Sequence, residues 1–186
     1  DAPDPTGDAG MSGAQNFILE DVPNVMKEYE GKKVAFFCTN CGMQEALQAA
    51  VLKEANAYYP LPCCPSPFHG FPASLGVAVD EADWGDIDAY IKKAAAILKE
   101  HDAEQRFSTW PVPVNYSMIT GAFEYATNWI NGKYTEKGAF ADVKAALDTA
   151  TGYDVQLTNY EDGDGKVYPT YLMLYFDRVN FAEFVD

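Results

Sequence analysis

Apolar residues recur at every third or fourth position along much of the first half of the chain, a spacing typical of amphipathic helices. This pattern predicts helices over 11–29 and 86–100, with Pro23 interrupting the first. The short apolar run 33–37 is typical of a buried parallel strand. A polar pair then leads into another helix, whose predicted inner face is Met43, Leu47, Ala50 and Val51. A helix, a strand, a short polar loop and a helix in this order predict an α/β unit with a parallel sheet.

The middle of the chain alternates between proline-rich loops and further predicted elements. Residues 60–72 hold five of the eleven prolines, so this segment is predicted to be an ordered loop. Further strands are predicted at 75–79 and 106–110. A helix that ends at an Asn-Gly pair is then marked by the apolar positions Tyr116, Ile119, Phe123, Ala126 and Ile130.

The last third of the chain changes character. A helix is predicted over 140–148, followed by strands around 155–158 and 168–176 that flank a turn rich in Asp and Gly. These strands predict a terminal β hairpin. The chain is therefore interpreted as an α/β unit over residues 1–108, followed by a helix and terminal strands over 109–186.

The charge balance and the hydropathy of the chain argue against two kinds of partner, nucleic acid and the membrane interior. Against 28 Asp and Glu residues stand 13 Lys and Arg residues, which gives a net charge of -15. A nucleic-acid partner is not expected, because phosphate binding requires clustered cations. No window reaches the length of uninterrupted apolar sequence that a membrane span needs, so no direct membrane span is expected in this chain.

The first candidate site lies where the strand 33–37 meets the following helix. Ligands of open α/β sheets bind beyond the carboxyl ends of the strands, where helix N-termini offer free N–H groups. Thr39, Asn40 and Gly42 occupy this position and are predicted to hydrogen-bond a ligand. The alternative is that Asn40 simply caps the helix.

A second group of candidates follows a later strand and a loop. Thr109 and Trp110 leave the strand 106–110, and the Trp110 ring could stack on a planar or sugar-like ligand or pack in the core. His69 lies in the proline-rich loop, where a histidine suggests a binding role. No catalytic motif is present, so no catalytic residue and no cofactor are assigned.

The four cysteines allow several chemical states. Cys38 and Cys41 form a C-T-N-C motif, and Cys63 and Cys64 are adjacent. A zinc site of all four is one possibility, although adjacent cysteines have the wrong spacing for a second zinc knuckle. A disulfide joining the two segments, with Cys41, Cys63 and Cys64 as candidates, reduced buried thiols, and thiol redox catalysis are the others.

Two sets of residues carry a resemblance to known families. The segment V-A-F-F-C-T-N with its following helix, and the later helix ending W-I-N-G-K, resemble the second lobe and return helix of type I periplasmic binding proteins. D-A-P-D-P-T-G-D-A-G, C-T-N-C-G-M-Q, L-P-C-C-P-S-P-F-H-G-F-P and R-F-S-T-W-P-V-P are similar to an uncharacterised family of bacterial, lipid-anchored proteins with that type of fold.

The resemblance implies an architecture and a cellular location. Residues 1–108 would form a second-lobe-like α/β unit, and 109–186 a return helix and strands that cross toward another lobe, so the chain would be an incomplete two-lobe protein. The protein would be located outside the cytoplasm and anchored to the membrane through a lipidated N-terminus not present in this chain. A membrane transporter is then a conceivable partner.

These observations lead to one principal hypothesis and two alternatives. The principal one is a solute-binding protein, not an enzyme, that captures a small polar ligand in an interlobe cleft through the candidate residues Thr39, Asn40, Gly42, His69, Thr109 and Trp110. The first alternative is a thiol- or zinc-dependent enzyme that uses Cys38, Cys41, Cys63 and Cys64. The second is the ligand-sensing module of a regulator.

Overall fold

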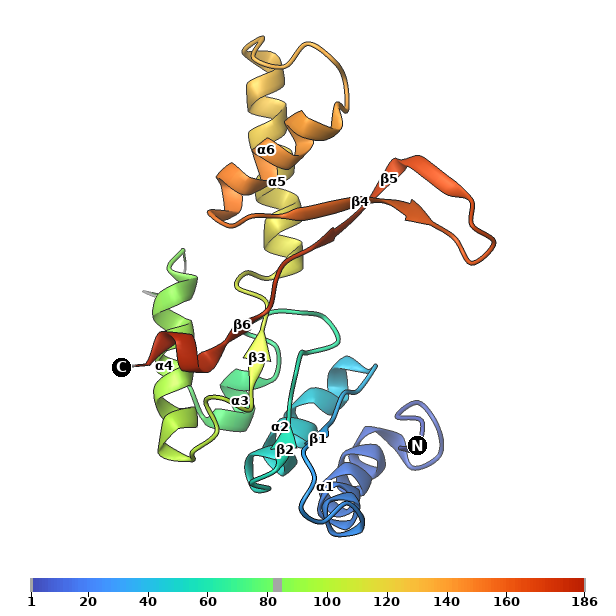
Figure 1. Ribbon diagram of the computed structural model, residues 1–186, viewed down its shortest axis with the longest axis vertical. Helices are drawn as coiled ribbons and strands as arrows, with labels where there is room; N and C mark the ends of the chain where they lie inside the picture. The colour runs from blue at the N-terminus through green and yellow to red at the C-terminus, as the bar shows by residue number, and fades with distance from the viewer. Residues whose placement is uncertain (1, 82–84, 186) are drawn as a thin grey trace. The chain divides into compact units, whose positions relative to one another are not determined.

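The computed structural model describes residues 2–81 and 85–185, which form two compact units (Figure 1). Unit 1 comprises Asp1–Pro111 together with Arg178–Asp186, and unit 2 comprises Val112–Asp177. The last residues of the chain therefore return to the unit in which the chain begins. Among the described residues, none of the helices has the length and apolar character that crossing a bilayer requires.

Unit 1 is a mixed α/β structure built on short strands. β1 (Val34–Ala35) pairs in parallel with β2 (Ala57–Tyr58), and β3 (Ser108–Thr109) pairs antiparallel with β6 (Val179–Asn180). A parallel bridge between Tyr59 and Phe107 joins the two pairs. The α/β class and the parallel pairing predicted from the sequence are thus confirmed.

The helices of unit 1 supply most of its core. They are α1 (Gly10–Glu28), α2 (Gln44–Leu52), α3 (Phe71–Leu75) and α4 (Ile87–Glu100), with short 3-10 turns η1 (Cys41–Met43) and η3 (Phe181–Phe184). The predicted inner face of α2 is buried, as is the apolar stripe of α4. The aromatic residues Tyr59, Phe71, Phe107 and Phe181 are fully buried and cluster at the centre.

Two sequence predictions in unit 1 are wrong. α1 continues through Pro23 without interruption. The proline leaves the carbonyl of Leu19 without its helical donor, but Leu19 is exposed, so water can satisfy that oxygen. The strand predicted at 75–79 does not form, because α3 extends to Leu75 and Gly76 ends it in the left-handed conformation. Of the apolar residues in that segment, Val77 is buried whereas Val79 is exposed, so the short apolar run did not specify a strand.

Unit 2 contains two helices and a hairpin, as predicted. α5 (Val114–Ile130) packs against α6 (Phe140–Thr151), and β4 (Gln156–Glu161) pairs antiparallel with β5 (Val167–Tyr175). Asp162 closes the hairpin turn by accepting hydrogen bonds from the N–H groups of Asp164 and Lys166. This carboxylate therefore serves the turn itself.

The buried face of α5 is formed by two small residues. Ser117 and Gly121 are buried, and a Cβ atom at Gly121 would overlap the side chain of Leu147 on α6. The apolar stripe that marked the helix in the sequence is instead exposed: Ile119, Phe123, Ala126 and Ile130. The glycine allows α6 to approach the opposite side of α5 closely, which leaves the larger apolar side chains uncovered.

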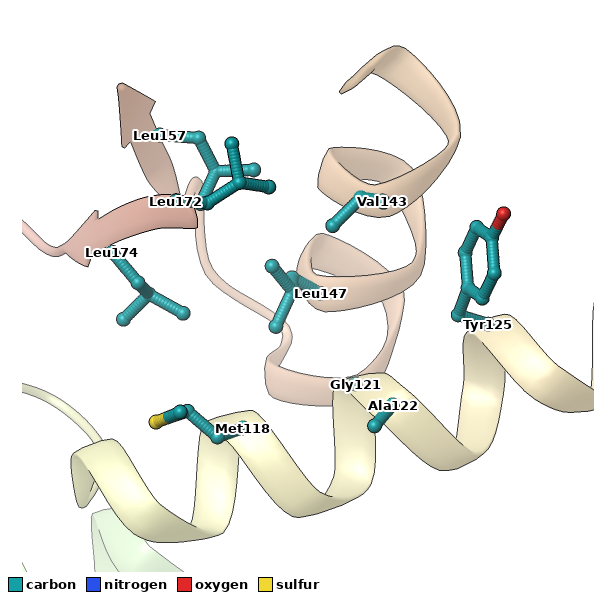
Figure 2. A pocket seen from close by; sticks show the side chains of 9 residues that line it. All are labelled: Met118, Gly121, Ala122, Tyr125, Val143, Leu147, Leu157, Leu172 and Leu174. Carbon is teal, nitrogen blue, oxygen red and sulfur yellow. The ribbon is translucent and has the colours of Figure 1, made fainter. Parts of the chain in front are cut away.

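An apolar hollow of about 300 Å³ lies between the helices and the hairpin of unit 2. Figure 2 shows the leucines of the hairpin directed toward α6 and Met118 of α5 on the same hollow. Tyr125 lines it, but its hydroxyl accepts a hydrogen bond from the N–H of Gly138. Because a specific ligand site needs a few convergent polar groups, this hollow is interpreted as loose packing within the unit.

Candidate functional site

The candidate site lies beyond the carboxyl ends of β1 and β2. Because these strands are parallel, the segments that follow them leave the sheet at the same edge. The segment after β1 leads through Thr39 and Asn40 into η1, and the segment after β2 becomes the proline-rich loop. The parallel pairing therefore brings together two segments that are more than twenty residues apart in sequence.

An open hollow of about 550 Å³ borders the first of these segments. Its lining consists of the N-terminal residues Ala2, Pro3, Asp4 and Pro5 together with Phe37, Cys38, Thr39, Asn40 and Met43. The Phe37 side chain is 55% exposed, and Thr39 is exposed as well. The predicted polar residues at the end of β1 are thus accessible to a ligand.

Asn40 and Gly42 both have a structural function in this segment. The side-chain oxygen of Asn40 accepts a hydrogen bond of 3.0 Å from the N–H of Gly42, so Asn40 caps η1 as the alternative interpretation predicted. The Gly42 carbonyl accepts a hydrogen bond of 2.7 Å from Gln15, and a Cβ atom at Gly42 would overlap Met11. Gly42 therefore joins this segment to α1, and its predicted contact with a ligand stays a prediction.

The remaining predicted ligand residues occupy different environments. His69 is half-buried in the proline-rich loop, and Trp110 is half-buried after β3. Thr109, by contrast, is fully buried, and its hydroxyl has no hydrogen-bond partner among the described residues. Because solvent does not reach this side chain, the predicted ligand contact of Thr109 stays a prediction.

Three of the four cysteines lie close together, and His69 lies close to all three. One ligand atom each from Cys41, Cys63, Cys64 and His69 lies within 4.8 Å of the other three. Cys38 is outside this cluster, and its half-buried thiol faces the carbonyl of Asn40 at 3.8 Å. Of the four cysteines in the alternative zinc prediction, the structure brings three together with His69, whereas Cys38 packs against the core.

The sulfur atoms of the cluster are free thiols in this structure. Cys41 lies 3.6 Å from Cys63 and 3.3 Å from Cys64, measured between sulfur atoms. Burial raises the pKa of Cys63, and hydrogen bonding with Cys41 raises the pKa of Cys64 to about 11. A cysteine nucleophile usually has a lowered pKa, which is the opposite of the direction at Cys63 and Cys64. The thiol-dependent enzyme stays a prediction. A disulfide from Cys41 to Cys63 or Cys64 stays a prediction.

Cys38 is expected to react slowly with alkylating reagents. Burial raises its pKa to about 11, so its thiolate fraction at neutral pH is lower than that of an exposed cysteine by about a hundredfold or more. Alkylation followed by peptide mass spectrometry should show a rate that rises about tenfold per pH unit through the alkaline range. The urea-unfolded chain is the control, and a native rate equal to the unfolded rate at neutral pH would contradict the burial of this thiol.

Sequence reasoning missed two glutamines that attach both segments to α2. Gln48 donates a hydrogen bond of 3.0 Å to the His69 carbonyl and accepts one of 2.7 Å from Ser74. Gln44 accepts from the Tyr59 hydroxyl and donates to the Cys38 carbonyl at 3.3 Å. Both glutamines are buried. Their four-residue spacing on the predicted inner face of the helix was the signal that could have found them.

Comparisons with known proteins agree with this geometry at the level of the fold. The fold is similar to the crystal structure of a protein from Clostridium difficile 630 described as a "putative transcriptional regulator", with a TM-score of 0.82 and 18% sequence identity. The match covers 97% of this chain and 49% of that one, so the present chain spans about half the length of that protein.

Sequence comparison identifies the family. Residues 1–108 match the proteins of unknown function DUF3798, and the chain belongs to this family. The matched residues include both segments of the candidate site, from β1 through the proline-rich loop. No curated protein matches the chain in sequence.

Proposed function

We propose that this chain is part of an extracytoplasmic solute-binding protein that captures a small polar ligand without transforming it. The observation that carries the proposal is the open hollow of about 550 Å³ beside Phe37 and Thr39. Its size falls in the range of about 300–1,000 Å³ that ligand sites occupy. Its position beyond the carboxyl end of β1 is the position at which α/β proteins bind their ligands.

The lining of the hollow suits a small polar ligand. The exposed Phe37 ring offers an apolar surface on which a flat or sugar-like ligand can pack. The Thr39 hydroxyl can donate and accept hydrogen bonds, and Asp4 adds a carboxylate, one oxygen of which accepts from Thr6. A ligand with hydroxyl or amino groups and one apolar face fits this combination.

The exposed stripe of α5 supports a second lobe in the complete protein. Ile119, Phe123 and Ile130 are 71%, 74% and 82% exposed, which is unusual for three large apolar side chains on one side of a helix. The structurally similar protein is about twice as long as this chain. We therefore propose that additional chain covers the stripe, as in the two-lobed type I periplasmic binding proteins that the sequence resembles. The lipid anchor and a transporter partner belong to the same proposal.

A ligand-sensing module of a regulator is the second candidate. It is favoured by the description of the structurally similar protein as a "putative transcriptional regulator". The net charge of -15 disfavours DNA binding by this chain itself. In that case a separate DNA-binding segment would respond to the same ligand, and the full reading frame would show either that segment or a lipid-attachment signal.

Thermal unfolding of the full-length protein with sugars, nucleosides and amino acids tests the proposal. A ligand at 100 times its Kd should stabilise the protein by about 2.7 kcal/mol and raise its Tm. Phe37→Ala and Thr39→Val should reduce the shift, whereas Thr135→Val, at an exposed threonine of unit 2, should leave it unchanged. If no compound raises the Tm, or if Phe37→Ala leaves the shift intact, the proposed site is wrong.

A further inference from the structure

We propose that Cys41, Cys63, Cys64 and His69 form a closed, four-coordinate Zn²⁺ site that joins the proline-rich loop to the start of α2. The four potential ligand atoms lie within 4.8 Å of one another, and they come from two segments that the sheet brings together. This inference is independent of the proposed solute binding, because it concerns a cluster of thiols and not the adjacent hollow.

The distances between sulfur atoms fit a tetrahedral metal site. Zinc–sulfur bonds of about 2.3 Å separate two ligands of a tetrahedron by about 3.8 Å. The separations from Cys41 are 3.3 Å and 3.6 Å, so small shifts of the side chains would bring the sulfur atoms to this spacing. They are much longer than the sulfur–sulfur bond of a disulfide, about 2.0 Å.

The hydrogen bonding of His69 leaves a suitable nitrogen for a metal. Its Nδ1 atom lies 2.9 Å from the carbonyl oxygen of Cys64. A carbonyl oxygen only accepts hydrogen bonds, so Nδ1 must carry the proton, and in the neutral ring the Nε2 lone pair is then the one available to a metal. Histidines that bind metals commonly donate their other ring N–H to a backbone carbonyl in this way.

The loop holds its three ligands in place before any metal binds. Prolines on both sides of the Cys63–Cys64 pair restrict its backbone, and the His69 N–H donates to the Ser66 carbonyl at 3.1 Å. Gln48 on α2 anchors the His69 carbonyl. Gly70 packs tightly on that glutamine in a left-handed conformation, where a Cβ atom would lie 2.8 Å from the Gln48 side chain. This arrangement explains how two adjacent cysteines can face the same point.

The ligand types select the metal. Thiolates and imidazole are the ligands of structural Zn²⁺ sites, whereas Mg²⁺ and Ca²⁺ prefer oxygen ligands. Four protein ligands leave no open position, which is typical of a structural site and not of a catalytic one. On binding, each of the three thiols releases its proton to solvent as its sulfur bonds to the metal. The site would fix the loop beside the cap of η1.

Metal titration of the reduced chain tests the site directly. Co²⁺ is expected to bind one ion per chain and to produce thiolate-to-cobalt charge-transfer bands together with the intense visible bands of tetrahedral cobalt, which Zn²⁺ then abolishes. Cys41→Ser and His69→Asn should weaken binding by more than about 100-fold, because changing a residue that only hydrogen-bonds to a metal ligand already costs about 10- to 100-fold. Cys38→Ser and His101→Asn are the matched controls, and both should bind as the unmodified chain does.

A second measurement uses only the unmodified chain, so it tests the site even if the variants fail to fold. Zinc should protect Cys41, Cys63 and Cys64 from alkylation without changing the rate at Cys38, and a chelator should reverse the protection. The proposal is overturned if the reduced chain shows no thiolate–cobalt bands, or if Cys38→Ser weakens binding as much as Cys41→Ser. It is equally overturned if zinc leaves the alkylation of the three cluster cysteines unchanged.

Discussion

Replacing Arg106 by methionine is expected to lower the free energy of unfolding by about 3–4 kcal/mol, because several main-chain oxygens would lose a charged donor. The guanidinium is almost completely buried, and burial lowers its pKa. It donates hydrogen bonds to the carbonyl oxygens of Val51, Leu52, Glu54, Ala57 and Asp102 at 3.0, 3.3, 2.9, 2.8 and 3.4 Å. The guanidinium thus provides hydrogen-bond donors to the carbonyl groups at the C-terminal end of α2, and it attaches the start of β2 to the segment that leads into β3.

Chemical denaturation of the variants measures this effect. Arg106→Lys should recover only part of the loss, since one ammonium group cannot reach carbonyls on both sides of the planar guanidinium. Arg178→Met is the matched control, because Arg178 is the other arginine of the chain and is exposed. Its effect should stay within about 0.5 kcal/mol. Equal effects at the two arginines would contradict the role assigned to Arg106.

Replacing Phe71 by alanine is expected to cost about 3–5 kcal/mol, as for other large-to-small changes at fully buried aromatic positions. Phe71 is fully buried at the start of α3, and its ring contacts those of Tyr59 and Phe181 at centroid distances of 5.9 and 5.0 Å. The substitution would leave a cavity between the sheet and α3. The loop that carries His69 ends at this point, so the same variant should also weaken cobalt binding.

Thermal and chemical unfolding of Phe71→Ala should be compared with those of Phe123→Ala. Phe123 is 74% exposed on α5, so its truncation in this chain should change the stability by less than about 0.5 kcal/mol. Phe71→Leu should cost about 1–2 kcal/mol, because it retains most of the apolar volume. A large loss for Phe123→Ala would show that the α5 stripe is packed in solution.

The amphipathic helices and the hairpin could be predicted because their signals are local. The apolar spacing of α4 and the turn around Asp162 each depend on residues that are close in sequence. The same reasoning failed at 75–79, because a short apolar run indicates burial without specifying the backbone conformation. It could not show which side of α5 faces α6, since the close approach at Gly121 involves residues far apart in sequence.

The candidate site was predictable in part. The position of Thr39 and Asn40 after a parallel strand could be inferred from the order of the elements, and so could the cap of η1. The partnership of His69 with three cysteines could not, because it depends on β1 and β2 pairing in register and on the folded path of the proline-rich loop. The burial of both residues of β3, Ser108 and Thr109, depends likewise on the segments that pack around this strand.

The amino-acid sequence by itself therefore determined the longer helices, the hairpin, the α/β class and the polar end of β1, because hydrophobic period and capping act over a few residues. Only the tertiary structure decided which cysteines meet His69, which side of α5 stays uncovered and which carbonyls Arg106 satisfies. These outcomes depend on contacts between segments that the sheet and the helices bring together from distant parts of the chain.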